Sequence, residues 1–186
     1  MSKKFIVVVD MQNDFIDGAL GSPDALAIVS DVVRALDKYK DYERVFTMDT
    51  HSEDYGIDPE SSIVPVPHCV VNTAGWLLRP SVARYIDADS LLVRKSTFGV
   101  NDWSHEFENR GYTSEDMANP EFVLCGLCTD ICVVSNAIAL RSAFPDAKIT
   151  VIENACAGTS KEAHESALVV MKSIGCNVVN EREDQE

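Results

Sequence analysis

The chain has 186 residues, of which 46% are hydrophobic and 25% are charged, the composition of an ordinary globular protein. This length is enough for one α/β domain with a substantial core. The formal net charge of −14 opposes binding to nucleic acid and to anionic membrane surfaces, so we expect neither as a partner.

The sequence shows no internal repeat and no low-complexity linker, and we therefore predict a single domain over residues 1–186. Only the apolar run Phe5–Val9 precedes Asp10, and this run is too short for a signal peptide or a membrane span. We expect a cytoplasmic protein in which the six cysteines are reduced thiols.

Strands and helices are predicted to alternate, from short apolar runs and from apolar residues at helical spacing. The six expected strands are Phe5–Val9, Arg44–Met48, Leu91–Arg94, Phe122–Cys125, Ile149–Ile152 and Val178–Val179. Between them we expect a helix that starts at Ser22-Pro23 and continues through Leu26, Val29, Val33 and Leu36, a helix over Trp76–Tyr85, one or two short helices within 101–118, a helix over 130–143, and a helix opened by a Thr159/Glu162 capping box. A long loop is expected over 52–71, between the second strand and the second helix. This order predicts an α/β fold, a doubly wound, mostly parallel six-stranded sheet flanked by helices in three layers.

Reactive side chains follow four of the predicted strands. Asp10 follows the first, Asp49 and His51 the second, Lys95 the third, and the Cys128–Cys132 turn the fourth. Ligands of open α/β sheets bind at the carboxyl ends of the strands. We therefore expect these side chains to meet at one edge of the sheet.

The segment Glu121–Val134 has the pattern of a strand, a glycine turn and a helix. Gly126 permits the turn, and Thr129 and Asp130 are predicted to cap the helix. Cys132 would then lie in the first helical turn, where backbone N–H groups favour a thiolate and can hold an oxyanion. Two alternatives are a buried structural thiol and a set of cluster ligands formed by Cys125, Cys128 and Cys132.

Two motifs of this chain resemble the motifs of a known family of enzymes. Val8-Val9-Asp10-Met11-Gln12-Asn13-Asp14-Phe15 resembles the opening motif of the isochorismatase-like cysteine hydrolases, and Gly126-Leu127-Cys128-Thr129-Asp130-Ile131-Cys132-Val133 resembles their nucleophile motif. Lys95 stands where the lysine of this family stands. The resemblance covers residues 5–179 and is greatest to the nicotinamidase branch, whose metal segments resemble Asp49-Thr50-His51 and Pro67-His68-Cys69.

The resemblance implies a role for each of these residues. Cys132 would be the nucleophile, Asp10 the base, and Lys95 the third member of the triad. The peptide between Leu127 and Cys128 would be cis, and the backbone N–H groups of Cys128 and Cys132 would form the oxyanion hole. Phe15 and Leu127 would contact the substrate, with Phe15 against its ring.

A divalent metal is also implied, zinc or iron being the usual occupants and manganese a further possibility. Its ligands would be Asp49, His51 and His68, and Glu60 is the nearest candidate for a fourth. The alternative is a pair of loop histidines that bind no metal. Many relatives carry an aromatic residue before Pro-Pro-His, where this chain has Val64-Pro65-Val66-Pro67-His68. Tyr55 and Trp76 are candidates to replace that aromatic residue.

The sequence therefore predicts a metal-containing cysteine amidohydrolase that converts nicotinamide and water to nicotinate and ammonia through a thioester on Cys132. The alternatives are an amidase of another small amide or N-carbamoyl compound, a metal-free vinyl-ether hydrolase of the same superfamily, a non-catalytic binding protein on this fold, and a thiol or cluster redox protein. We expect a small-molecule amide substrate, no nucleic-acid or membrane partner, and a homo-oligomer.

Overall fold

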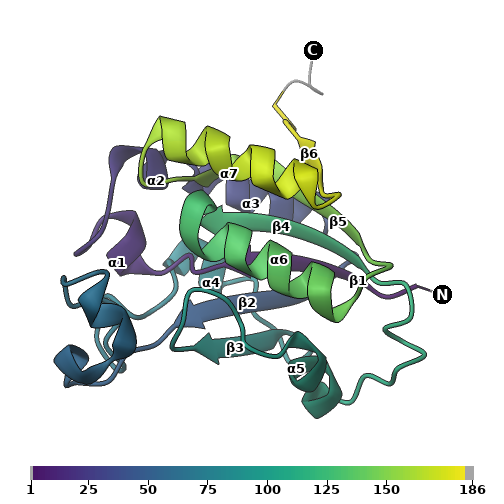
Figure 1. Cartoon of the computed structure of the whole chain (residues 1–186), viewed down its shortest axis with the longest axis horizontal. Helices are drawn as coiled ribbons and strands as arrows, with labels where there is room; N and C mark the ends of the chain where they lie inside the picture. The colour runs from purple at the N-terminus through teal and green to yellow at the C-terminus, as the bar shows by residue number, and fades with distance from the viewer. Residues whose placement is uncertain (1, 183–186) are drawn as a thin grey trace.

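The computed structural model describes residues 2–182, and within that range the strands form one six-stranded sheet in the order β3-β2-β1-β4-β5-β6. Every pair of neighbouring strands is parallel (Figure 1). The predicted doubly wound α/β fold is confirmed. The strands are β1 (Lys4–Val9), β2 (Glu43–Asp49), β3 (Leu91–Lys95), β4 (Glu121–Leu127), β5 (Lys148–Ala157) and β6 (Asn177–Val179).

Helices cover both faces of the sheet. The helices α3 and α4 pack together on one face, and α5, α6 and α7 pack on the other (Figure 1). The α-helices are α1 (Asn13–Ile16), α2 (Pro23–Ala27), α3 (Val29–Lys38), α4 (Pro80–Ala83), α5 (Trp103–Arg110), α6 (Val134–Ala143) and α7 (Lys161–Ser173). Short 3-10 turns η1 (Tyr55–Ile57) and η2 (Pro59–Ser62) lie in the long loop, and a π-helical turn, η3 (Thr129–Val133), precedes α6.

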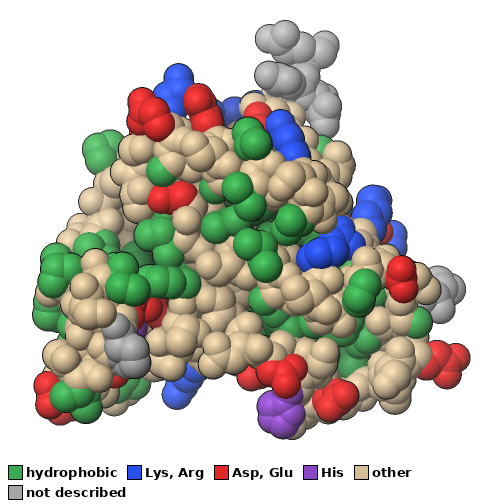
Figure 2. Space-filling view, in the orientation of Figure 1, with side chains coloured by type: hydrophobic (Ala, Val, Ile, Leu, Met, Phe, Trp, Pro, Cys, Tyr) green, Lys and Arg blue, Asp and Glu red, His purple; other side chains and the backbone are tan. Residues whose placement is uncertain are grey.

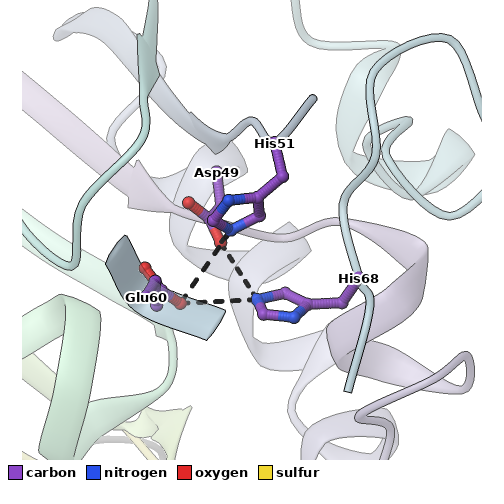
Figure 3. A group of neighbouring side chains, drawn as sticks. All are labelled: Asp49, His51, Glu60 and His68. Carbon is purple, nitrogen blue, oxygen red and sulfur yellow. Dashed lines mark hydrogen bonds and ion pairs between the residues drawn. The ribbon is translucent and has the colours of Figure 1, made fainter. Parts of the chain in front are cut away.

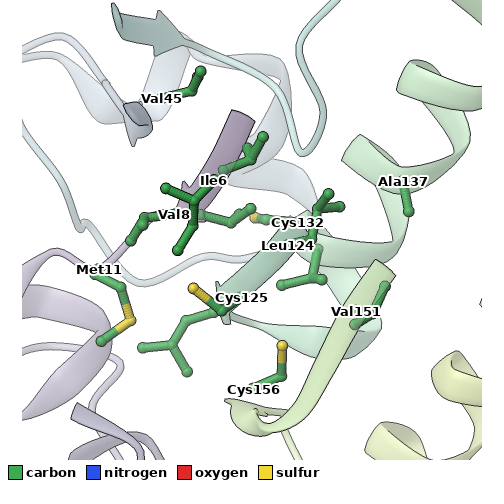
Figure 4. Packing of buried hydrophobic residues seen from close by; sticks show 14 of the residues in the cluster. Ile6, Val8, Met11, Val45, Leu124, Cys125, Cys132, Ala137, Val151 and Cys156 are labelled. Carbon is green, nitrogen blue, oxygen red and sulfur yellow. The ribbon is translucent and has the colours of Figure 1, made fainter. Parts of the chain in front are cut away.

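The core is built around β1, which lies between β2 and β4. All five residues of Phe5–Val9 are buried, as expected for a strand covered on both faces. Figure 4 shows buried side chains from three neighbouring strands, among them Val8 of β1, Leu124 and Cys125 of β4, and Val151 and Cys156 of β5. A rigid centre of this kind fixes the strand ends from which the reactive side chains project.

Two predicted helices differ from the observed ones. The helix expected over Trp76–Tyr85 is confined to α4, because Pro80 disfavours a helical conformation at the preceding residue, and Arg79 is accordingly extended at ψ 128°. Ser22 does cap a helix, accepting a hydrogen bond from Ala25 N–H, but that helix ends at Ala27 and α3 begins at Val29. Leu26 consequently lies on the outer side, with 47% of its surface exposed.

The predicted capping roles of Thr129 and Asp130 are wrong. No side chain caps η3, because both polar groups bond to other parts of the chain. Thr129 Oγ1 pairs with His164 Nδ1 at 2.8 Å, and the Asp130 carboxylate accepts from Thr159 N–H and Thr159 Oγ1. The predicted Thr159/Glu162 capping box is also wrong, because Ser160 and not Thr159 caps α7, accepting from Ala163 N–H.

Asp31 anchors the C-terminal part of the described chain to α3. Its carboxylate is buried, pairs with Arg182 and Arg34, and accepts from Asn154 Nδ2 at 3.2 Å. Burial opposes the charged form, but the hydrogen bonds from Arg182 and Arg34 hold the pKa of Asp31 below its ordinary value. The charged carboxylate is therefore the form that the fold selects.

We expect Asp31→Asn to destabilise the protein by about 1–3 kcal/mol at neutral pH, because it removes the charge that the two arginines bind. A folded-state pKa below the unfolded value stabilises the fold above the unfolded pKa, and this contribution is lost as pH falls through the folded pKa. The difference in unfolding free energy between wild type and Asp31→Asn should therefore shrink as the pH is lowered through the acid range. Urea denaturation at several pH values measures it, and a pH-independent difference would contradict the prediction.

Some large apolar side chains remain on the surface. Ile57 and Ile63 in the long loop and Val169 on α7 are each more than half exposed. Figure 2 shows apolar side chains over the face that carries α6 and α7, with acidic and basic groups mostly toward its edges. Among residues 2–182, no helix has the length and apolar character needed to cross a membrane. Homo-oligomerisation stays a prediction.

Candidate active site

Four neighbouring strands bring the predicted site residues to one edge of the sheet. Asp10 directly follows β1, Asp49 and Lys95 end β2 and β3, and η3 follows β4. Asp49 and Lys95 are register partners in the parallel ladder, so their side chains start from the same level. The predicted meeting of these segments at the carboxyl edge is what the structure shows.

Lys95 lies between Asp10 and Cys132. Its Nζ is 2.7 Å from Asp10 Oδ2 and 3.7 Å from Cys132 Sγ. All three side chains are buried, with 0%, 6% and 5% of the residue surface exposed for Asp10, Lys95 and Cys132. A carboxylate, an ammonium and a thiol in mutual contact and away from bulk water form an arrangement suited to proton transfer and nucleophilic attack.

Thr47, which the sequence reasoning missed, orients Asp10. Its hydroxyl donates to Asp10 Oδ1 at 2.6 Å and accepts from Asp10 N–H at 3.2 Å. Asp10 itself has a positive φ of 47°, a conformation that aspartate tolerates better than most residues. A threonine inside the apolar run Arg44–Met48 was the only sequence signal for this contact.

Burial and the Lys95 charge act in opposite directions on the two acidic groups. Burial raises the pKa of Asp10 and raises the pKa of the Cys132 thiol well above its ordinary value, while the Lys95 ammonium opposes both shifts. Burial disfavours the ammonium too, but the carboxylates of Asp10 and Asp49, and the Cys132 sulfur when it is ionised, hold the pKa of Lys95 well above its ordinary value. Burial thus favours the protonated thiol of Cys132, beside the Asp10 carboxyl group, whose raised pKa makes its carboxylate a stronger base.

The segment Gly126–Cys132, which is predicted to carry the nucleophile, approaches β1 closely. Gly126 has φ +123°, and a side chain there would come within 2.1 Å of the Val9 carbonyl oxygen, so only glycine fits. The peptide between Leu127 and Cys128 is cis, as the resemblance implies. η3 then begins at Thr129, and Cys132 lies within this turn.

Asp49, His51, Glu60 and His68 form a second group beside the first (Figure 3). One ligand atom from each lies within 4.8 Å of all the others, and all four residues are buried. Asp49 Oδ2 is 3.0 Å from His51 Nε2 and 3.3 Å from His68 Nε2, and Glu60 Oε1 is 3.5 Å from His68 Nε2. The structure thus brings Glu60 together with the three other predicted ligands.

The outer nitrogens of both histidines are held by oxygen atoms. His51 Nδ1 lies 3.1 Å from Asp58 Oδ2, and His68 Nδ1 lies 2.8 Å from the Val66 carbonyl oxygen. This arrangement fixes the rings with Nε2 turned inward, as in metal-binding histidines of other proteins. Asp58 was not predicted, since its contact depends on the fold of the long loop.

The group fits a divalent cation. Burial lowers the pKa of His68, yet the carboxylates of Asp49 and Glu60 outweigh it and raise that pKa to about 10. The negative charges of these two buried carboxylates therefore favour a cation in the space between the imidazole rings of His51 and His68. Among the described residues, Glu60 Oε2 is buried without a hydrogen-bond partner. Two imidazoles and two carboxylates are ligands that zinc, iron and manganese accept.

Asp58→Asn is expected to weaken metal binding about 10–100-fold, because the amide no longer provides a carboxylate to hold His51 Nδ1–H and keep the ring basic. His51→Ala, which removes the ligand itself, should weaken binding further. Chelator competition with Zn²⁺ measures both constants. An unchanged constant for Asp58→Asn would exclude this role.

Asp49 belongs to both groups. Its Oδ2 faces the two histidines, while Oδ1 lies 3.4 Å from Lys95 Nζ. Burial opposes the charged form, but the hydrogen bonds from His51 and His68 and the Lys95 charge keep the pKa of Asp49 low. The carboxylate is therefore ionised, and it belongs both to the four-residue group of Asp49, His51, Glu60 and His68, called the metal-type group below, and to the predicted triad of Asp10, Lys95 and Cys132.

A cavity of about 340 Å³ opens over both groups. Phe15, Leu127, Cys128 and Cys132 line it, together with Glu60 and His68, so both residues predicted to contact the substrate, Phe15 and Leu127, lie on the cavity wall. Phe15 packs edge-on against His68 with ring centroids 5.2 Å apart. Further walls, which sequence reasoning missed, come from Leu20, Val64, Phe98 and Ile131.

Neither aromatic candidate occupies the cavity wall. Tyr55 packs against the rings of His51 and His68 and donates to the Val64 carbonyl at 2.6 Å. Trp76 stacks beneath Arg94 and donates to Thr50 Oγ1. The proposal that Tyr55 or Trp76 replaces the missing aromatic residue is therefore wrong, and Val64 lines this part of the wall.

The sequence model of the isochorismatase domain family matches residues 4–183, nearly the full length of the sequence. The chain belongs to the isochorismatase family. A curated Bacillus subtilis protein, described as the uncharacterized isochorismatase family protein PncA, is 29% identical over 192 residues, covering 95% of this chain and 98% of that protein.

Solved structures of this family share the fold. The crystal structure of nicotinamidase PncA from Bacillus subtilis is 30% identical with a TM-score of 0.78, covering 96% of this chain and 99% of that one. The pyrazinamidase of Pyrococcus horikoshii in complex with zinc is 26% identical with a TM-score of 0.76, again covering 96% and 99%. The isochorismatase-family chain therefore has full-length relatives with known structures.

Proposed function

We propose that this chain is a metal-dependent cysteine amidohydrolase that converts nicotinamide and water to nicotinate and ammonia. The observation that carries the proposal is one cavity bounded by Cys132, beside Asp10 and Lys95, and by Glu60 and His68 of the metal-type group. An amide-hydrolysing enzyme is supported by the family match and by relatives described as nicotinamidases.

In the proposed reaction, Asp10 accepts the proton of the Cys132 thiol as the sulfur attacks the amide carbonyl carbon. Lys95 balances the negative charge shared by the carboxylate and the sulfur. The backbone N–H groups of Cys128 and Cys132 are proposed to hold the oxyanion of the tetrahedral intermediate. When the C–N bond breaks, the nitrogen takes the proton from Asp10 and leaves as ammonia. Water, deprotonated by Asp10, then hydrolyses the thioester and frees the Cys132 thiol.

Asp49, His51, Glu60 and His68 are the residues proposed to hold the metal, with zinc the first choice and iron or manganese possible. A metal bound there would supply a Lewis acid that attracts the pyridine nitrogen of the substrate and so orients its ring. Phe15 provides the apolar surface for that ring, and Leu127 closes the cavity near Cys132.

A second candidate is an amidase of another small amide or N-carbamoyl compound. The specific observation is the aliphatic side chain of Val64 in the part of the wall where many relatives carry an aromatic residue, which leaves Phe15 and Phe98 as the aromatic side chains that line the cavity. The metal-free vinyl-ether hydrolase is disfavoured by the buried four-residue group. A metal cluster bound by Cys125, Cys128 and Cys132 is disfavoured for two reasons. Cys125 is buried in the core within a strand, and the group of possible metal ligands found among residues 2–182 contains no cysteine.

Ammonia release from nicotinamide by the purified protein, with metal content measured in the same sample, tests the proposal. About one metal per chain with rapid release is the expected result. Metal without release from nicotinamide, but with release from another small amide, would favour the second candidate. Absence of both metal and amidase activity would exclude the proposed function. The cytoplasmic location and the homo-oligomer remain predictions.

A further inference from the structure

Asp49 lies where the β1–β2 pairing has ended. The ladder between β1 and β2 extends only to Val8 and Phe46, so on this side the backbone of Asp49 has no strand neighbour. The other side is still paired, with Asp49 opposite Lys95. An unpaired peptide group here would be both buried and free to shift, at the residue whose carboxylate serves both halves of the site.

The side chain of Gln12 takes the place of the missing strand. Its Oε1 accepts from Asp49 N–H at 2.7 Å, and its Nε2 donates to the Asp49 carbonyl at 2.8 Å. The second hydrogen of Nε2 goes to the Trp76 carbonyl, also at 2.8 Å. Gln12 is fully buried, and its acceptor and both of its donors are in use.

We propose that Gln12 is a positioning residue, which fixes the backbone of Asp49 and thereby aims its carboxylate at His51, His68 and Lys95. The inference rests on the metal-dependent function proposed above. A residue that binds the backbone of a metal-ligating residue changes metal affinity only through the position of the ligand atoms. Hydrogen bonds from residues outside the ligand set orient metal ligands in the same way. Gln12 itself contacts none of the inward-turned ligand atoms.

The chemistry of the contact demands a primary amide of this length. Asp49 N–H needs an acceptor, while the carbonyls of Asp49 and Trp76 need two donors. Glutamate has the same size but, even when protonated, donates only one hydrogen bond. Asparagine has the right groups, but its side chain is one methylene shorter.

The test compares Gln12→Glu with Asn13→Asp. Asn13 is the adjacent residue, and its Nδ2 also donates to a backbone carbonyl, that of Ala74 at 2.9 Å, in an exposed position. The two variants therefore carry the same amide-to-carboxylate change at adjacent positions, the N-cap and the first residue of α1, but only Gln12 touches a proposed ligand residue. The Zn²⁺ dissociation constant of the full-length protein is measured by chelator competition, and the melting temperature is measured without metal.

We expect Gln12→Glu to raise the Zn²⁺ dissociation constant by about ten-fold or more, with Asn13→Asp close to wild type. Equal zinc affinity in Gln12→Glu and wild type would overturn this inference but not the proposed function, even if Gln12→Glu melts at a lower temperature. An equal loss in both variants would also overturn it. A wild-type chain that binds no zinc or other divalent metal would overturn the metal site on which the proposed function also rests. Should Gln12→Glu fail to fold, Gln12→Met, which removes the donors and the charge, is measured in its place against the same criterion.

Discussion

Cys132→Ala is expected to abolish ammonia release, with a loss of about 10⁴-fold or more, because the sulfur proposed to form the thioester is removed. The loss should appear in kcat and not in metal content, since Cys132 does not belong to the four-residue metal-type group. Single-turnover assays with nicotinamide, or with the small amide that proves to be the substrate, measure the effect. Mass spectrometry of quenched wild type should also show an acyl adduct on Cys132.

The matched control is Cys176→Ala. Cys176 is a free, buried thiol between α7 and β6, and it does not line the cavity. The control should keep wild-type turnover per folded molecule. If Cys132→Ala retained activity, or if both variants lost it equally, Cys132 would not be the nucleophile.

Lys95→Met is expected to be among the most destabilising single substitutions in this chain. It leaves the carboxylates of Asp10 and Asp49 buried without the ammonium that lies between them, and breaking a buried ion pair costs about 3–5 kcal/mol. Asp10 should then take up a proton, which also removes the base and stops turnover. Urea unfolding and ammonia release measure the two effects on the same preparation.

Lys148→Met is the comparison for this experiment. Lys148 pairs with Glu121 at 3.1 Å, but its side chain is 67% exposed. An exposed ion pair contributes about 0–1 kcal/mol, so this variant should unfold almost as wild type does. Similar destabilisation by the two substitutions would show that Lys95 is not held in a charge-dependent buried site.

The sequence was sufficient to predict the strands and the edge at which the site lies. Apolar runs such as Phe5–Val9 mark buried strands, and a charged residue directly after such a run must lie at the strand end. Asp10, Asp49 and Lys95 were predicted in this way. Glu60 could be suggested only from the resemblance, because its position depends on two short 3-10 turns in a long loop.

The residues that hold the reactive groups could not be predicted. Thr47, Asp58 and Gln12 act on partners far along the chain or across a folded loop, and polar residues of these types occur widely without such roles. Thr129 and Asp130 illustrate the opposite error. Both are good capping residues by type, but tertiary contacts with His164 and Thr159 use their side chains instead.

The shared carboxylate of Asp49 limits how this enzyme can be re-engineered. A substitution at Asp49 made to change the preferred metal would also alter the charge around Lys95 and, through it, the sulfur of Cys132. Glu60 and Asp58 contact the histidines, and no ion pair joins either of them to Lys95 among residues 2–182. Libraries that aim to exchange the proposed metal and leave the proposed nucleophile, Cys132, undisturbed should therefore diversify residues 58 and 60 and leave residue 49 as it is.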